Sequence, residues 1–259
     1  MQANEEVKRV NENLEGIVQH RTKLLVDANH ELDTFLYRAS HDLRSPLSSI
    51  IGLCNIASHM TQEELVEKVK LTTNGMDHLL SKLKAISEIN RPTEYSSFSL
   101  LNAVERVRYM FRSQINSNRI QFKVSCPDTI VFYTYPDLLE IILTNLIENA
   151  LFYSKMSDRP VAVVEFNAKV EADVVEFSVY DNGVGVDNTI RPKLFEMFFK
   201  GNEKSAGNGL GLYVVLKSVQ ALRGTITMES EPGNYTKFIV QIPLNHKKAT
   251  EHELVEVLG

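Results

Sequence analysis

The sequence predicts an α-helical hairpin that forms a four-helix bundle in a dimer, followed by a mixed α+β domain. Over about the first 57 residues, apolar residues recur at alternating three- and four-residue steps. A second helical segment then follows a capping signal, and beyond residue 94 short β-type runs alternate with helical stretches. The 259 residues are enough for two small domains.

One long helix is expected from about Val7. Steps of three and four between apolar positions are typical of a helix that buries one stripe against a partner helix, as in a coiled coil. Charged Arg21 interrupts the stripe at one position. The stripe consists of Val7, Val10, Leu14, Ile17, Leu24, Ala28, Leu36, Ala39, Leu43, Pro46, Ile50, Leu53 and Ala57.

The second helix is expected to begin at Thr61, with Glu64 completing a capping box, and to end near Arg91-Pro92. Its stripe is also narrow, and a hairpin with so little apolar surface can complete its core by pairing with a second copy. We therefore expect a homodimer. The stripe residues are Leu65, Val69, Met76, Leu79, Leu83 and Ile86.

The second domain is predicted to begin at residue 94. Its first helix has Ser99 as a natural N-cap. The predicted strands are Ile120 to Ser125, Ile130 to Thr134, Val161 to Ala168, Val174 to Tyr180, Thr225 to Met228 and Lys237 to Ile242, and the predicted helices are Leu100 to Gln114, Asp137 to Phe152 and Leu210 to Leu222.

Composition excludes several classes of function. The net charge is -5 and no long run of Lys and Arg occurs, which argues against binding to nucleic acid or an anionic membrane. Cys54 and Cys126 lack metal-ligand neighbours and indicate reduced cytosolic thiols. No apolar run approaches the ~18 residues of a membrane span. A cytoplasmic chain is expected, and a fragment of a membrane-anchored parent would look the same.

His41 lies in an unusual helical segment, SHDLRSP at residues 40–46. At ~3.6 residues per turn it lies roughly opposite the stripe that contains Leu43, facing water, with Ser45 one turn away on the same side. Pro46 costs about 3 kcal/mol inside a helix. A kink beside an exposed histidine indicates a functional site, although an ordinary surface histidine near a helix bend is the commoner case.

The segment LTNLIENA at residues 143–150 places Asn145 and Asn149 on one face of a predicted helix. Carboxamide oxygens can bind Mg²⁺, which uses few protein ligands and completes its shell with phosphate oxygens and water. Two polar residues on the solvated side of an amphipathic helix would look the same. This segment alone therefore does little to distinguish a Mg²⁺ site from a solvated helix face.

Two glycine-containing loops are candidates for a ligand site. Asp181 ends a predicted strand before Asn182 and Gly183, where its carboxylate can accept a proton from an exocyclic amine; a plain Asn-Gly hairpin turn is the alternative. Residues 207–212, GNGLGL, run into a predicted helix whose positive end suits triphosphate oxygens. Residues 194–206, between the two loops, have the composition of a mobile lid. The alternative is that the aromatic residues of this segment belong to the hydrophobic core.

Taken together and in this order, these segments resemble the histidine kinases of two-component signalling over about residues 35–243. Five short segments resemble the family's H, N, G1, F and G2 boxes, and a sixth resembles its last glycine box. The segments are, in that order, residues 41–46, 145–149, 181–185, 195–200, 207–212 and 231–238. The six segments in this order indicate the family far more specifically than any one segment alone.

The resemblance implies a domain organisation. Residues 1–30 would be a signalling coiled coil, 31–93 the dimerisation and histidine phosphotransfer hairpin, 94–245 a two-layer ATP-binding sandwich of the Bergerat or GHKL fold, and 246–259 a polar tail. It also implies ATP and Mg²⁺ as cofactors, a response regulator receiver domain as partner, and an upstream sensor domain outside this sequence.

The resemblance also implies residue roles. His41 would attack the γ-phosphorus, Asp42 would orient the imidazole and accept its other proton, and Asn149 would bind Mg²⁺. Asp181 would bond the adenine amino group, and Ser45 would stand where relatives position a water for phosphatase action. The other residues expected at ATP are Asn145, Tyr153, Gly183, Gly185, Phe199, Lys200, Gly207, Gly209, Leu210, Gly211, Leu212 and Thr236.

Three positions depart from the family pattern. Phe152 stands where the N box usually has Lys or Arg, so another cation is expected at the phosphates, Lys200 first and Lys155 in reserve, unless both are plain surface lysines. Ser45 stands where Thr or Asn is common, which leaves phosphatase activity open. Tyr235 stands where the last glycine box usually has glycine.

Two other functions remain as alternatives. The first is a clamp ATPase of the gyrase or Hsp90 kind, but such enzymes activate water with a Glu at the position of Asn145, and a carboxamide is no base. The second is a degenerate dimeric scaffold without activity. Phe152 favours it faintly, whereas the intact residues His41, Asn149 and Asp181 argue against it.

Overall fold

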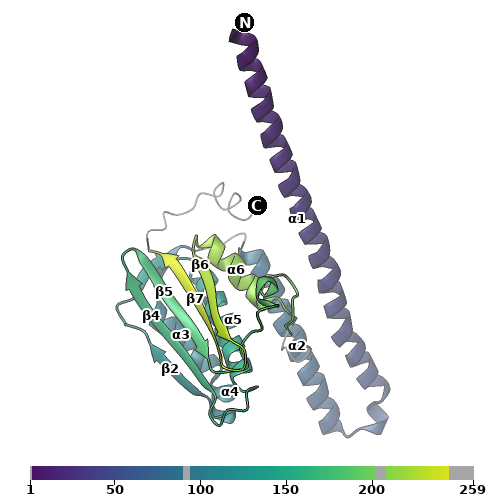
Figure 1. Ribbon diagram of the computed structural model, residues 1–259. Helices are drawn as coiled ribbons and strands as arrows, with labels where there is room; N and C mark the ends of the chain where they lie inside the picture. The colour runs from purple at the N-terminus through teal and green to yellow at the C-terminus, as the bar shows by residue number, and fades with distance from the viewer. Residues whose placement is uncertain (1, 90–93, 202–207, 245–259) are drawn as a thin grey trace. The chain divides into compact units, whose positions relative to one another are not determined.

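The computed structural model describes residues 2–89, 94–201 and 208–244 (Figure 1). The chain divides into two compact units, the first ending at Thr72 and the second beginning at Thr73. The boundary between the two units falls inside the second long helix, α2 (Gln62–Ile89), so each unit contains part of this helix.

In the first unit, helix α1 (Gln2–Asn55) is continuous through Pro46, and a 3₁₀ turn, η1 (Ala57–His59), reverses the chain into α2. The predicted apolar stripe is visible from residue 39 onward. Its members are buried or half-buried there, whereas every other residue between 39 and 57 except Asp42 is exposed. The helix ends two residues before the predicted Ala57.

The capping box predicted at the start of α2 is confirmed. The backbone N–H of Thr61 donates to Oε2 of Glu64 at 3.1 Å, and the N–H of Glu64 donates to Oγ1 of Thr61 at 3.2 Å. These bonds satisfy two donors that a helix start leaves without partners, so α2 begins at a position that the local sequence defines.

The second unit is built on a five-stranded sheet in the order β2-β4-β5-β7-β6. Strand β2 runs parallel to β4, and the other neighbours are antiparallel. The central strand β5 is buried over much of its length. The strands are β2 (Gln121–Ser125), β4 (Val163–Glu171), β5 (Val174–Asp181), β6 (Thr225–Glu231) and β7 (Tyr235–Pro243).

Helices α3 (Leu100–Met110), α5 (Pro136–Ser154) and α6 (Gly211–Ala221) form the second layer against this sheet (Figure 1). Alternate residues of β4 and β7 are buried, as expected for a sheet covered on one face. Apolar residues of α5 such as Leu143 and Ile147 fill the space between the layers. The predicted two-layer α+β sandwich is therefore confirmed.

Two details differ from the sequence prediction. Strand β1 (Ser96–Ser99), which pairs with β3 (Val131–Thr134), was not predicted, because Phe98 is its one apolar residue and no alternation marks it. The predicted helix from Leu100 to Gln114 is divided at Phe111, and α4 (Arg112–Ser117) follows. Phe111 leaves the helical region at φ -91° and ψ 9° while its ring stays in the core.

The cap predicted for α3 is present, since the N–H of Asn102 donates to Oγ of Ser99 at 3.4 Å. Both cysteines are free thiols. Among the residues that the structure describes, no helix has the length and hydropathy needed to cross a membrane.

Candidate functional site

A pocket that is partly open to solvent lies in the second unit at the end of β5 and the start of α6. Most residues expected at ATP line it, namely Asn149, Tyr153, Asp181, Gly185, Phe199, Lys200, Gly209, Gly211, Leu212 and Thr236. These residues come from five segments of the chain, so the fold brings together motifs that are far apart in sequence.

Asp181 is the last residue of β5 and is only 4% exposed. Burial raises the pKa of its carboxyl group to about 7, and a hydrogen bond from the N–H of Gly183, 2.9 Å from Oδ1, opposes that rise. Across the sheet it lies opposite Thr236, which also lines the pocket. A carboxylate in this position is a strong acceptor for a ligand amine.

The alternative interpretation of Asn182-Gly183 as a hairpin turn is wrong. Strand β5 forms its hairpin with β4 at residues 172–173, at its other end. The Asn182 side chain bonds the start of β4, accepting from the N–H of Val163 at 2.7 Å and donating to the carbonyl of Val161 at 2.9 Å. The segment after Asp181 is therefore a fixed loop beside the pocket.

Gly183 shapes the pocket from behind. A Cβ atom at this residue would lie 2.4 Å from the carbonyl oxygen of Tyr153 and 2.6 Å from Oδ1 of Asp181. Only glycine therefore allows the loop to pack against the end of α5 and hold Asp181 in place.

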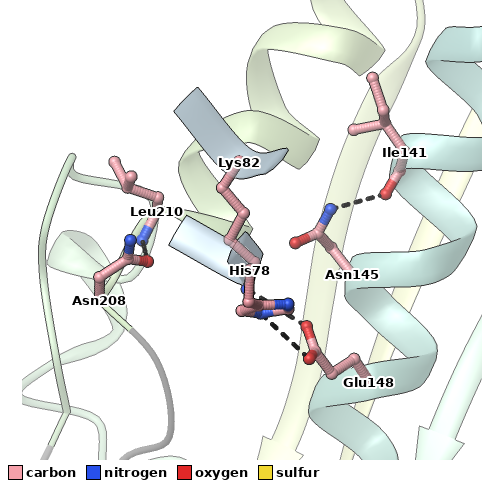
Figure 2. Close-up of polar contacts among 7 residues, drawn as sticks. All are labelled: His78, Lys82, Ile141, Asn145, Glu148, Asn208 and Leu210. Carbon is pink, nitrogen blue, oxygen red and sulfur yellow. Dashed lines mark hydrogen bonds and ion pairs between the residues drawn. The ribbon is translucent and has the colours of Figure 1, made fainter. Parts of the chain in front are cut away.

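The two carboxamides of α5 differ in their surroundings. Asn149 lines the pocket, whereas Asn145 lies beneath it, 7% exposed, with Nδ2 donating to the carbonyl of Ile141 at 2.8 Å (Figure 2). Oδ1 of Asn145 has no hydrogen-bond partner among the described residues. It lies 3.1 Å from the point where a Cβ atom of Gly211 would be.

The side chains of Asn149 and Asn145 fit a Mg²⁺ ion that binds together with a nucleotide. The described residues contain no group of three or more His, Cys, Asp or Glu side chains that could hold a metal ion. Mg²⁺ bound with a nucleotide needs few protein ligands, because phosphates and water supply the rest. The carboxamide oxygens of Asn149 and Asn145 are hard donors of the right kind.

One side of the pocket is the first turn of α6, which begins at Gly211 after the capping residue Leu210. Leu210 itself is buried and does not line the pocket, and its N–H donates to Oδ1 of Asn208 at 3.4 Å (Figure 2). Gly207, also expected at ATP, lies outside the described residues. Free N–H groups at a helix start attract phosphate oxygens.

Gly209 permits this turn, and its replacement should damage nucleotide binding. Its φ is +74°, and a Cβ atom would lie 2.5 Å from the backbone carbon of Phe198. We expect Gly209→Ala to weaken ATP binding at least about tenfold by calorimetry, because backbone must move to relieve the clash. Gly233→Ala is the matched control, since Gly233 has φ +76° and nothing within 4 Å of its Cβ position. Equal affinities of the two variants would contradict the steric role of Gly209.

Among the residues that the structure describes, two lysines line the pocket. Lys200, which the sequence places at ATP, lies on the segment after β5 and is exposed. Lys82 comes from α2, and sequence reasoning missed it, because nothing near it in the chain marks a ligand site. Lys155, held in reserve, caps the end of α5 with its ammonium 5.6 Å from the centre of the Phe152 ring.

In the first unit, the His41 side chain is 71% exposed, as predicted from helical periodicity. Its Nδ1 lies 3.2 Å from Oδ1 of Asp42. If this contact is a hydrogen bond to an ionised carboxylate, which can only accept, Nδ1 is the donor and the lone pair of Nε2 is free. Ser45 is also exposed, one helical turn further on.

Comparison with known protein families covers both units. Residues 31–92 match the family model described as the His Kinase A (phospho-acceptor) domain. Residues 134–246 match the model described as the Histidine kinase-, DNA gyrase B-, and HSP90-like ATPase.

Individual proteins agree with these matches. The methanogenesis regulatory histidine kinase FilI of Methanothrix harundinacea is 31% identical over 239 residues, which are 88% of this chain and 26% of FilI. The chain thus spans about a quarter of the length of the first curated relatives that it matches.

Two solved structures show the same fold. Histidine kinase AdeS of Acinetobacter baumannii superposes with a TM-score of 0.66 at 23% identity, over 80% of this chain and 98% of AdeS. Histidine kinase ThkA, solved in complex with the response regulator protein TrrA, gives a TM-score of 0.65 at 22% identity, over 83% of this chain and 62% of the other.

Proposed function

Because the chain belongs to the sensor histidine kinases, we propose that it uses ATP and Mg²⁺ to phosphorylate its own His41 and then passes the phosphoryl group to an aspartate of a response regulator. The observation that carries this proposal is the His41–Asp42 pair. Its 3.2 Å contact leaves Nε2 free on an exposed helix face. The clamp ATPase and the inactive scaffold offer no reason for this pair.

In the proposed reaction, Nε2 of His41 attacks the γ-phosphorus of ATP. The bond between the γ-phosphorus and the bridging oxygen breaks, and ADP leaves with that electron pair. The proton on Nδ1 passes to Asp42, so the phosphorylated imidazole is neutral at the ring. The product is a phosphoramidate, which retains enough transfer potential to phosphorylate a carboxylate.

The pocket residues bind and orient the nucleotide. Asp181 accepts the hydrogen bond of the adenine amine, and the first turn of α6 offers N–H groups to the phosphates. Mg²⁺, held by Asn149 with the open oxygen of Asn145 nearby, would neutralise part of the phosphate charge.

The proposed organisation follows the sequence expectation: residues 1–30 transmit a signal, 31–93 dimerise and carry His41, and 94–245 bind ATP. A homodimer, a receiver-domain partner and a cytoplasmic location belong to this proposal, as does an upstream sensor domain. The matched ThkA was solved with a response regulator, which supports the partner class. The exposed hydroxyl of Ser45 is a candidate for positioning a water when the phosphoryl group is removed.

Incubation with γ-labelled ATP and Mg²⁺ tests the proposal against both alternatives. A histidine kinase gives acid-labile label on the protein. A clamp ATPase releases free phosphate without protein label, and a scaffold does neither. Either of the last two outcomes would overturn the proposal.

Asp42 should control the rate of this step. We expect Asp42→Asn to slow phosphorylation of His41 by about 10² or more, because a carboxamide cannot take the Nδ1 proton. Rapid-quench measurement of the labelled chain gives the rate. Asp33→Asn, an exposed change on the same helix, is the control and should leave it unchanged. A normal rate in Asp42→Asn would remove Asp42 from the role of general base.

A further inference from the structure

The ATP pocket contains a lysine that no motif of the chain assigns. Lys82 reaches it from the last third of α2, and its side chain is only 12% exposed. A lysine ammonium is rarely kept out of water without a specific partner. Here the partner is Glu148 of α5, whose Oε2 lies 3.2 Å from Nζ (Figure 2).

Lys82 is held in this position by the packing of its own helix. Ala85 and Ile89, one and two turns further along α2, are buried in the same apolar core as α5. Glu148 also pairs with a second basic side chain, because its other oxygen, Oε1, lies 3.2 Å from Nε2 of His78 (Figure 2). If Lys82 turned away, Glu148 would still have His78 as a partner.

The ammonium of Lys82 lies next to the first turn of α6. It is 3.7 Å from the point where a Cβ atom of Gly211 would be, and Oδ1 of Asn145 is 3.1 Å from the same point. The missing side chain of Gly211 therefore leaves a space between a cation and an unpaired acceptor oxygen, at the first residue of α6. A phosphate with its metal ion can use both groups, because the phosphate oxygens bind the ammonium and the metal ion binds Oδ1 of Asn145.

We propose that Lys82 is a phosphate-binding residue of this kinase and supplies the cation that Phe152 removes from the N box. The proposal rests on the function proposed above. In the free protein Glu148 holds the ammonium, and when a nucleotide binds, Nζ turns from Glu148 to the β- and γ-phosphate oxygens. One cation on α2 thus replaces the usual one on α5.

Lys82 and Lys200 differ in what they offer to the phosphates. Lys200 is exposed and loses hydration when it binds, whereas Lys82 is already largely desolvated and fixed by Glu148. A charge that is desolvated beforehand gives up less hydration when phosphate oxygens replace the Glu148 carboxylate as its partner. Lys82 is therefore the stronger candidate of the two.

Calorimetric titration of the whole chain with ATP and Mg²⁺, ADP and adenosine tests this proposal. We expect Lys82→Met to weaken ATP binding at least about tenfold and ADP binding less, with adenosine affinity unchanged, because only the phosphates meet the ammonium. Lys82→Arg should keep most of the ATP affinity. Lys84→Met is the matched control, since Lys84 is 76% exposed on the same helix and pairs with Glu88.

Glu148→Gln separates phosphate binding from a purely structural ion pair. If Lys82 binds phosphate, this variant keeps its ATP affinity or gains some, because the ammonium is no longer held back. Normal ATP affinity in Lys82→Met, or an equal loss of ATP and adenosine affinity, would overturn the proposal. So would loss of phosphate-dependent affinity in Lys200→Ala alone. A wild-type chain that binds no nucleotide would instead overturn the proposed function itself.

Discussion

Asp181→Asn should weaken ATP and adenosine binding by about 10- to 100-fold, the usual cost of losing a charged hydrogen-bond acceptor at a ligand amine. The nucleotide affinities are measured by calorimetry. Asp187→Asn, an exposed carboxylate in the following loop, is the matched control and should bind normally. Unchanged adenosine affinity in Asp181→Asn would mean that the pocket does not hold adenine at β5.

The same substitution should make the second unit more stable at pH 8. The pKa of Asp181 is about 7 in the folded chain and 3.8 in a model compound. Between these values the folded state holds a proton that the unfolded state has lost, so the free energy of unfolding falls as pH rises from about 4 to 7 and is level above 7. At about 1.4 kcal/mol per pKa unit, the loss is up to about 4 kcal/mol.

Asparagine removes this pH dependence while its Oδ1 can still accept the Gly183 N–H. Asp181→Asn should therefore unfold at higher denaturant concentration than wild type at pH 8, and the two should converge near pH 4. Adenosine affinity of the wild type should also rise about tenfold from pH 6 to pH 8, as the carboxyl group ionises. Equal stability of both chains at pH 8 would contradict the burial of a charged Asp181.

His41→Gln should abolish stable labelling of the chain by γ-labelled ATP and leave ATP affinity unchanged. The nucleophile is lost, but every residue that lines the nucleotide pocket belongs to the second unit. Labelling is followed after alkaline quench and binding by calorimetry. His30→Gln, an exposed histidine earlier on α1, should label fully. Full labelling of His41→Gln would show that another residue accepts the phosphoryl group.

Much of the fold could be predicted because its signals are local. The capping box at Thr61 and Glu64 depends on residues three positions apart, and it forms as expected. The burial of alternate strand residues follows from period-two patterns in the same way. Strand β1 carries no such pattern and exists because it pairs with β3, more than 30 residues away.

The candidate site was predictable where a motif marks it. Asp181, Gly185 and Gly209 line the pocket as expected, whereas Leu210 is core and Gly183 supports the loop from behind. Lys82 could not be foreseen, because its ion pair with Glu148 joins residues 66 positions apart. Such contacts depend on packing between elements, which sequence periodicity does not encode.

The identity of the phosphorylated nitrogen tests the central claim most directly. Phosphorylated chain, kept at alkaline pH, is digested and the peptide that contains His41 is examined by ³¹P NMR, which distinguishes the two phosphohistidine isomers. The contact between Nδ1 and Asp42 predicts that the phosphoryl group is on Nε2 of His41. A phosphoryl group on Nδ1, or on Asp42 or Ser45, would contradict the account.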